Sequence, residues 1–439
     1  MNIALVVLDT LRKDSFDESF GWLPGKRFEN AYSTSSWTVP AHASLFTGYY
    51  SSELGVHSKN RNLNCPESTL PELLSSSGYK TACFSCNPYI SKTFNFDRGF
   101  DEFGGGWRLQ HHNPKIFDWE KFISNNSDGS STRYVKAFWK CITEDCQTIP
   151  SLMHGVRLKM RGTGKSTKQF QDDGAQSALE YLRNKNIRSN EFLFMNLMEA
   201  HAPYTPPQKY RTVHIGERPG LLQTVTGDSS TDNKKVKRAY EDCVRYLSDI
   251  YEKIFEELKQ DFDYIITLAD HGEMFGEKGV WAHTHGVYPE LTHVPLTIYN
   301  NDLEGVSEKP VSILDIHRTI LEIAGIESKS RGQNLLGDFD ESYKLTEYMG
   351  LTREDIDQLL KENVSKRTID RYDSVFRGIV SNQGDYGYET VNGDQALNPN
   401  NKKVLTQYVE SMKIRGVNDD LEEDISPEVK QQLEELGYA

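Results

Sequence analysis

Short, unbroken apolar runs that each end in a polar residue constrain the fold of this chain most strongly. Residues 3–8 (IALVVL) are followed by Asp9, and residues 264–269 (YIITLA) are followed by Asp270 and His271. A strand that is covered on both faces carries apolar residues continuously rather than alternately, as in a parallel sheet between two layers of helices. The pattern therefore predicts an α/β fold with a largely parallel central sheet.

The polar residues that follow these runs are candidates for a functional site. In an open parallel sheet, ligands bind beyond the carboxyl ends of the strands, where Asp9, Asp270 and His271 would meet. Carboxylate oxygens and an imidazole nitrogen are suitable ligands for a divalent cation. An Asp-His pair alone is more often part of a capped turn, so the metal prediction depends on its combination with Asp9 and Thr38.

Thr38 stands at the start of a predicted short helix. Pro40 favours the first helical turn and Gly48 favours a helix end, so we expect the helix to begin directly after Thr38. Unpaired N–H groups and the positive end of the helix dipole would then face an oxyanion near Thr38. By itself Thr38 would be an ordinary helix cap. Together with the strand ends it predicts one metal ion with four ligands: Asp9, Thr38, Asp270 and His271.

The composition narrows the function. The net charge of −14 argues against nucleic acid as a partner, because nucleic-acid binding depends on Lys and Arg. No apolar run approaches the ~20 residues of a membrane-spanning helix, and residues 3–8 lack the basic leader and cleavage site of a signal peptide. We expect a cytoplasmic protein without a transmembrane segment, in which the six cysteines are reduced thiols.

The chain divides into two predicted parts. Strand and helix signals alternate through residues 1–340, which we assign to a catalytic domain. Residues 107–167 interrupt this alternation and are predicted either as a lid or recognition insertion or as a solvated surface insertion; residues 220–235 are predicted to be flexible. Residues 341–439 are assigned to a C-terminal subdomain, with a hairpin at 376–380 and 386–391 in a small antiparallel sheet and a terminal helix ending at Gly437.

Several motifs together resemble the sulfatase family of the alkaline phosphatase superfamily over nearly the whole chain. They are LVVLDTLR at 5–12, PAHASLFTG at 40–48, LPELL at 70–74, RGFD at 98–101, AHAPY at 200–204, DHGEMFG at 270–276 and EELGY at 434–438. The resemblance implies a three-layer α/β/α sandwich with a large, mostly parallel central sheet, followed by a small C-terminal antiparallel sheet.

The resemblance also implies roles for individual residues. Asp9, Asp270 and His271 resemble metal ligands, while Thr10 replaces a second acidic ligand. Thr38 stands where sulfatases carry the Cys or Ser that is oxidised to formylglycine. Three histidines resemble catalytic residues: His42 at the position of the signature Arg, His201 as the group that binds the ester or protonates the leaving group, and His283 where relatives place a Lys or His on the transferred group.

Thr38 decides between mechanisms. Its Cβ carries a methyl group, so oxidation of this side chain cannot give the formylglycine aldehyde. We therefore predict an unmodified Thr38 nucleophile in a metal-dependent hydrolase of sulfate or phosphate esters. Phosphate monoesters or diesters, or phosphoryl transfer, are favoured. The alternatives are a sulfuric ester hydrolase that works without formylglycine and an inactive sulfatase-fold binding protein.

One divalent ion is the expected cofactor, with Ca, Mn, Mg and Zn all open and Mn or Zn favoured by the histidine ligand. A second ion would need further ligands, and the candidates are Glu199, His201, His283 and His285. The expected partner is a small anionic ester, with a glycan or a lipid as options for its alcohol part.

Overall fold

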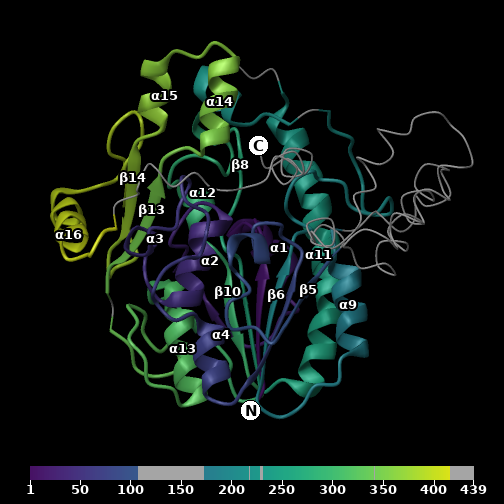
Figure 1. Cartoon of the computed structure of the whole chain (residues 1–439). Helices are drawn as coiled ribbons and strands as arrows, with labels where there is room; N and C mark the ends of the chain where they lie inside the picture. Colours follow the sequence, from purple (N-terminus) through teal and green to yellow (C-terminus); the bar gives the residue numbers. More distant parts are fainter. Residues whose placement is uncertain (107–172, 217, 228–230, 341, 416–439) are drawn as a thin grey trace, which may run out of the picture.

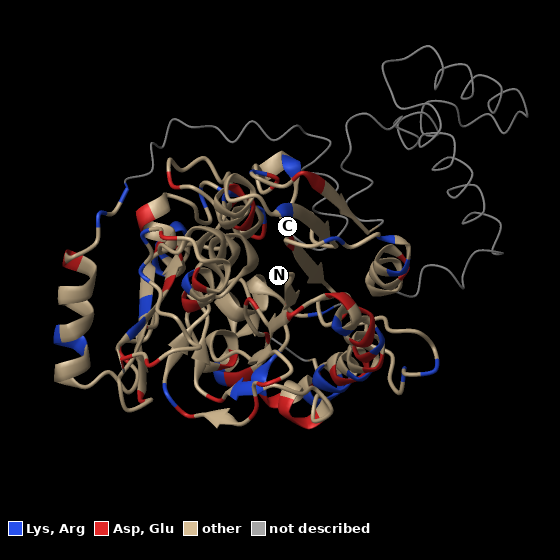
Figure 2. Cartoon of the chain, turned by 90° about the horizontal axis from the view of Figure 1, so that it is seen from below, with Lys and Arg blue, Asp and Glu red and all other residues tan. Residues whose placement is uncertain are grey.

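The structure is a computed structural model that describes residues 1–106, 173–216, 218–227, 231–340 and 342–415. The insertion predicted at 107–167 and the terminal helix predicted to end at Gly437 lie outside the described residues. Figure 1 shows a central sheet with helices on both sides and a small sheet next to it. Acidic and basic residues are interspersed along the outer helices, whereas the middle of the molecule is mostly uncharged (Figure 2).

An eight-stranded sheet forms the centre of the molecule. β1 (Ile3–Leu8) lies in its middle and is parallel to both neighbours, β6 (Glu191–Leu197) and β7 (Tyr264–Leu268). β4 (Lys80–Ser85) and β5 (Glu102–Gly105) extend the sheet beyond β6 in the same direction. Every residue of β1 and β6 is buried, which agrees with the continuous apolar runs in the sequence.

At the other edge of the sheet, one strand runs antiparallel to its neighbours. β10 (Leu296–Tyr299) runs antiparallel between β7 and β2 (Lys26–Phe28), and β11 (Val306–Ser307) pairs with β2 in parallel. Two short pairs lie outside the large sheet: β3 (Ala31–Tyr32) with β12 (Val311–Ser312), and β8 (Met274–Phe275) with β9 (Trp281–Ala282). The sheet is therefore mostly parallel, as predicted.

Helices cover both faces of the sheet and complete the three layers (Figure 1). One layer contains α2 (Thr38–Thr47), α4 (Leu70–Ser76) and α13 (Leu314–Ala324), which contact one another. The other contains α1 (Lys13–Ser19), α9 (Ala175–Asn184) and α11 (Asn233–Asp261). The predicted sandwich is confirmed.

Gly48 ends α2 as the sequence predicts. It has a φ of 76°, in the left-handed region, and its N–H bonds to the carbonyl of Ser44. A Cβ atom at this position would lie 2.6 Å from His317 Nδ1, so both the backbone conformation and the close approach of α13 require glycine.

The segment predicted to be flexible at 220–235 contains ordered structure, so this prediction is wrong in part. α10 (Leu221–Thr226) lies within it, and α11 starts at Asn233. The hydroxyl of Thr224 in α10 accepts a hydrogen bond from the backbone N–H of Trp281 at 2.9 Å, and Leu221 is buried. Long-range contacts therefore hold α10 in place.

A small antiparallel sheet follows the large one. It consists of β13 (Lys344–Met349), β14 (Val375–Val380) and β15 (Tyr386–Tyr388), so the predicted hairpin is confirmed. The helices of this region are α14 (Arg353–Lys361), α15 (Lys366–Tyr372) and α16 (Pro399–Glu410), and the helices of one turn are α3 (Ser51–Leu54) and α12 (Pro289–Thr292). The backbone N–H of Glu347 in β13 bonds to the carbonyl of Thr34 at 2.9 Å. The small sheet therefore holds the segment that leads into α2.

The cysteines that the structure describes are buried and form no disulfide bond, in agreement with the prediction of thiols: Cys65, Cys83, Cys86 and Cys243. Among the described helices, none combines the length and the apolar composition needed to cross a bilayer.

Candidate active site

Two carboxylates meet at the carboxyl edge of the central sheet. Asp9 directly follows β1, and Asp270 follows the neighbouring parallel strand β7, with Val7 and Leu268 paired in register. His271 comes next, and all three side chains are buried. Their ligand atoms all lie within 4.8 Å of one another. Within the described part of the chain, no other group of three His, Cys, Asp or Glu residues has this geometry.

The orientation of His271 suits a metal ligand. Its Nδ1 lies 2.9 Å from the carbonyl oxygen of Gly272, so Nδ1 carries the proton that is donated there. The opposite nitrogen, Nε2, then carries a lone pair and lies 3.4 Å from Asp270 Oδ2 and 4.0 Å from Asp9 Oδ1. Metal-binding histidines are commonly fixed in this way. No described residue donates a hydrogen bond to the buried Asp270 Oδ2, and a cation between these acceptors would satisfy it.

Asp9 and Asp270 have opposite pKa shifts, although burial opposes the ionisation of both. For Asp9, the charges of His201 and His271 and a hydrogen bond from Asn87 outweigh burial and lower the pKa to about 2. For Asp270, burial and the charge of Asp9 raise the pKa well above its usual value. Two ionised carboxylates at this distance repel each other, and a divalent cation would remove that repulsion. The donor set of two carboxylates and one imidazole therefore fits such an ion.

The Thr38 hydroxyl lies beside this group, with Oγ1 3.3 Å from His271 Nε2. The prediction that α2 begins after Thr38 is wrong by one residue, because Thr38 is already helical and the extended Trp37 occupies the cap position. The Thr38 hydroxyl consequently contacts the metal-binding group instead of capping the helix. The first turn of α2 also leaves backbone N–H groups unpaired next to it.

Two asparagines that the sequence motifs do not single out bind Asp9 and Thr38. Asn87 Oδ1 accepts a hydrogen bond from Tyr89 N at 2.9 Å, which directs Nδ2 toward Asp9 Oδ2 at 2.8 Å and Thr38 Oγ1 at 3.4 Å. Asn196 Nδ2 lies 3.2 Å from the same Asp9 oxygen. Asn87 follows β4 by two residues and Asn196 lies near the end of β6. Their position at strand ends is the signal in the sequence that identifies them.

His42 lies within α2, next to Thr38. Asn196 Nδ2 is 3.3 Å from His42 Nε2 and donates to it, so His42 Nδ1 carries the proton that bonds to the Thr38 carbonyl oxygen at 2.9 Å. Burial lowers the pKa of His42 to about 4, and the charge of Asp9 offsets this only in part. The imidazole is therefore neutral at pH 7. Because the side chain is fully buried and both nitrogens are engaged, its geometry suits a residue that positions Thr38.

The other two predicted histidines lie next to His271. The ring centroid of His283 is 4.6 Å from that of His271 and 5.2 Å from that of His201. His201 Nδ1 donates to the Ala202 carbonyl oxygen at 2.7 Å. All seven residues that the sequence proposes for the site are therefore brought together: Asp9, Thr38, His42, His201, Asp270, His271 and His283.

Glu273 links His283 to two further side chains. Its Oε1 lies 3.1 Å from His283 Nδ1, and its Oε2 accepts hydrogen bonds from the Tyr204 hydroxyl at 2.6 Å and Arg218 Nη1 at 3.1 Å. Burial opposes ionisation of Glu273, but the charges of His283 and Arg218 outweigh it and hold the pKa well below its usual range. The carboxylate therefore fixes the orientation of the His283 ring. Arg218 lies in a loop and carries no motif that indicates this contact.

The remaining candidates for a second ion do not join the ligand group. Glu199 Oε1 accepts a hydrogen bond from the backbone N–H of Ala175 at 2.6 Å. His285 packs among aromatic rings, with its centroid 4.8 Å from that of Tyr372. Thr10, which stands in place of a second acidic ligand, donates its hydroxyl to Asp9 Oδ1 at 2.7 Å. The described residues thus form one compact site for an ion.

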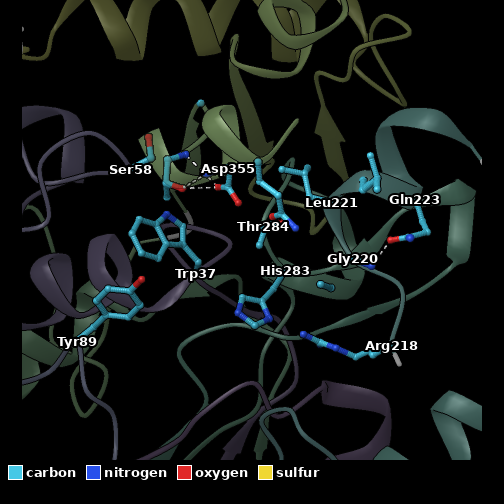
Figure 3. Close-up of a pocket in the computed structure, with 15 residues that line it drawn as sticks. Trp37, Ser58, Tyr89, Arg218, Gly220, Leu221, Gln223, His283, Thr284 and Asp355 are labelled. Carbon is cyan, nitrogen blue, oxygen red and sulfur yellow. Dashed lines mark hydrogen bonds between the residues drawn. The ribbon is translucent and has the colours of Figure 1, made fainter. Parts of the chain in front are cut away.

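A cavity of about 290 Å³ opens beside this centre (Figure 3). Trp37 and Tyr89 form an aromatic side of it, with their rings nearly perpendicular at 5.9 Å. His283, whose ring packs against that of His271, lines the cavity together with Arg218, and residues of α10 and α14 line other parts of it. The remaining lining residues come from these loops and helices: Ser58, Gly220, Leu221, Leu222, Gln223, Ala282, Thr284, Gly350, Thr352, Asp355 and Gln358.

Known proteins share this architecture. The structure is similar to that of a phosphonate monoester hydrolase from Silicibacter pomeroyi, with a TM-score of 0.60 and 16% identity over 93% of this chain and 94% of that one. It is also similar to a protein solved in complex with its substrate, D-glucosamine-2-N,6-O-disulfate, with a TM-score of 0.55 and 15% identity over 93% and 96% of the two chains. The sheet and the layers define an alkaline phosphatase-like α/β fold.

Sequence comparison gives the family. The sulfatase family model matches residues 21–326, and the chain therefore belongs to the sulfatase family. A sulfatase from Formosa agariphila is 24% identical over 356 residues, which cover 70% of this chain and 64% of that protein. The chain thus matches slightly less than two thirds of the length of this relative.

Proposed function

We propose that the protein is a metal-dependent hydrolase of phosphate or sulfate esters in which the unmodified Thr38 hydroxyl is the nucleophile. The observation that carries the proposal is the position of Thr38 Oγ1, 3.3 Å from His271 Nε2 and at the start of α2. Membership of the sulfatase family and the similarity to a phosphonate monoester hydrolase support an ester hydrolase of this kind.

The residues around Thr38 suit an in-line displacement. Oγ1 would attack phosphorus or sulfur, so that the Oγ1–P or Oγ1–S bond forms while the bond to the alcohol oxygen breaks. The alcohol would leave with a proton donated by protonated His201, and water would then return a proton to His201 as it attacks phosphorus or sulfur and releases the phosphate or sulfate from Thr38. A divalent cation held by Asp9, Asp270 and His271 would supply Lewis acidity that favours loss of the Thr38 hydroxyl proton to solvent and that polarises the ester.

Phosphoesters are the favoured substrates of this proposal. The aldehyde hydrate of formylglycine, which sulfatases are expected to use, cannot form from Thr38, whereas a threonine hydroxyl can attack phosphorus directly. Hydrolysis of sulfate esters without formylglycine is the second candidate, because the family match and the curated relative are both sulfatases. We place the alcohol part of the substrate in the cavity beside His283. A sugar alcohol is one option, since a structural neighbour was solved with a sulfated sugar.

We also propose that residues 1–340 form the catalytic domain and that residues 341–439 form a subdomain which completes the cavity. Thr352, Asp355 and Gln358, which lie in or next to α14, line that cavity. They support a role of the C-terminal part in choosing the alcohol.

A substrate panel with matched variants tests the nucleophile. Aryl phosphate monoesters, phosphodiesters and sulfate esters would be assayed with Ca²⁺, Mn²⁺, Mg²⁺ and Zn²⁺ in turn. Thr38→Ala should lower kcat/KM by roughly a thousandfold or more, as expected for loss of a nucleophile, while Thr38→Ser keeps a hydroxyl and should retain measurable turnover. Equal thermal stability of both variants would show that the fold is intact. Full activity of Thr38→Ala would dismiss Thr38 as the nucleophile.

A further inference from the structure

The cavity wall next to the metal-binding group carries an arginine that the proposed displacement does not use. Among the described residues that line the cavity, Arg218 is the only lysine or arginine. It lies just before α10, and Figure 3 shows its guanidinium end directed toward His283. An anionic ester that reaches Thr38 would therefore pass this guanidinium.

One buried carboxylate holds Arg218 and His283 together. Glu273 binds His283 Nδ1 through Oε1 at 3.1 Å and Arg218 Nη1 through Oε2 at 3.1 Å. Arg218 Nη1 also lies 3.2 Å from the Tyr204 hydroxyl. These contacts fix the guanidinium relative to the ring of His283, which in turn packs 4.6 Å from the ring of His271. The two cavity-lining groups thus form a rigid pair beside the centre.

Arg218 retains hydrogen-bond donors that point elsewhere. Its Nε and Nη2 make no hydrogen bond with any described residue, and its side chain is 21% exposed. If Arg218 served only to neutralise Glu273, a bidentate pair with both carboxylate oxygens would be expected. Instead, Arg218 binds Glu273 through one nitrogen, Nη1. The remaining planar donors match the spacing of two oxygens of a phosphate, sulfate or carboxylate.

Among the described residues next to Thr38, His42 does not supply a comparable donor. It is buried, and its two ring nitrogens are engaged by Thr38 O and Asn196 Nδ2. We propose that Arg218 binds an oxyanion of the substrate between His283 and the cavity, an inference that rests on the proposed function. This oxyanion is either the transferred phosphoryl or sulfuryl group or an anionic substituent on the alcohol that fills the cavity.

Binding measurements test Arg218 without requiring turnover. Calorimetry on the metal-loaded protein would use four probes: inorganic phosphate, sulfate, phenylphosphonate and 4-carboxyphenylphosphonate. If Arg218 binds the transferred group, Arg218→Gln should weaken phosphate and phenylphosphonate binding about tenfold or more, as expected for loss of a charge-assisted pair. If it binds a substituent, only the gain in affinity from the carboxylate of 4-carboxyphenylphosphonate should disappear.

Three further variants separate direct binding from an effect through Glu273. Arg183→Gln removes an exposed arginine on α9 and should bind all probes as the wild type does. Tyr204→Phe removes the hydroxyl that bonds to Glu273 and contacts Arg218 Nη1, but it leaves the guanidinium and its pairing with Glu273. An equal loss of affinity in this variant would assign the effect to the contacts around Glu273 and overturn the proposal. Arg218→Lys keeps the positive charge but loses the planar guanidinium, so it should bind the probes severalfold more weakly than the wild type. If Arg218→Gln does not fold, the affinity of Arg218→Lys tests the proposal in its place.

Unchanged affinity for all four probes in the Arg218 variants would also overturn the inference. The outcomes also distinguish failure of the proposed function from failure of the Arg218 proposal. If no ester is turned over but Arg218→Gln weakens oxyanion binding, the protein is an oxyanion-binding member of the family and Arg218 keeps its role. If esters are turned over and binding is independent of Arg218, the proposed hydrolase stands and Arg218 only supports Glu273.

Discussion

Replacing His285 with leucine should make the protein less sensitive to acid. His285 is 1% exposed, and neither ring nitrogen has a hydrogen-bond partner among the described residues. Its ring lies among four aromatic rings, at centroid distances of 4.8 to 6.4 Å: Tyr288, Tyr348, Tyr372 and Phe376. Burial lowers the pKa of His285 from 6.5 to about 3. The folded protein therefore keeps this side chain neutral far below the pH at which the unfolded chain takes up a proton.

The sign of the effect follows from the two pKa values. Below a pH of 6.5, His285 binds a proton in the unfolded chain but stays neutral in the folded protein. The free energy of unfolding therefore falls as the pH falls, until the pH reaches the pKa of folded His285 at about 3. Between about pH 7.5 and about pH 5.5, this one group should cost about 1.4 kcal/mol of the free energy of unfolding. Leucine cannot take up a proton, and it also removes two unsatisfied buried nitrogens, each worth about 1 kcal/mol or more.

Urea unfolding followed by tryptophan fluorescence measures this difference. The free energy of unfolding would be determined at both pH values for the wild type, for His285→Leu and for His214→Leu, which removes a histidine at an exposed position. We expect His285→Leu to lose about 1.4 kcal/mol less than the wild type between the two pH values, whatever the packing cost of the new side chain. An identical loss in both proteins would refute the assignment of His285 as a buried neutral group.

Two further predictions concern the centre. Asn87→Ala removes the amide that binds Asp9 Oδ2 and Thr38 Oγ1; because a hydrogen bond to a charged group contributes about 1.5–3 kcal/mol, kcat/KM on the best ester should fall roughly tenfold to a hundredfold, and an unaltered rate would contradict this role. Removal of divalent ions with a chelator should abolish turnover, and an ion added at about a hundred times its Kd should raise the free energy of unfolding by about 2.7 kcal/mol. An Asp270→Asn variant serves as the control, because the ion should not raise its free energy of unfolding.

The sequence predicts the fold well where both faces of a strand are buried. The runs at 3–8 and 264–269, which form β1 and β7, are almost entirely apolar, because helices cover the sheet on both sides. Their register places Asp9 and Asp270 at one edge without any knowledge of the loops. The helix start at Thr38 is predicted to within one residue, because Pro40 and Gly48 impose local backbone preferences.

The sequence predicts less where polar residues are buried by long-range contacts. β13 contains Lys344 and Glu347, two charged residues that the sequence alone would place on the surface, yet both are buried. Lys344 pairs with Asp315 at 2.9 Å, and the backbone N–H of Glu347 bonds to the carbonyl of Thr34. The same limit applies to Arg218, whose position depends on a tertiary contact with Glu273. No local propensity encodes such pairs, because the partners are separated by many residues and meet only after the sheet has formed.

Four neighbouring strands each deliver one polar residue to the same edge. In the order β7, β1, β6 and β4 these are Asp270, Asp9, Asn196 and Asn87. The asparagines both donate to Asp9 Oδ2, whereas the hydrogen bonds that Asp270 receives from described residues come from the backbone N–H groups of Thr10 and His271 and go to Oδ1. Asp9 is therefore held ionised and fixed, and the second oxygen of Asp270 has no donor in the part of the chain that the structure describes. This asymmetry follows from the strand order, since only the central strand β1 has the amide-bearing neighbour β6 on one side and the carboxylate-bearing β7 on the other.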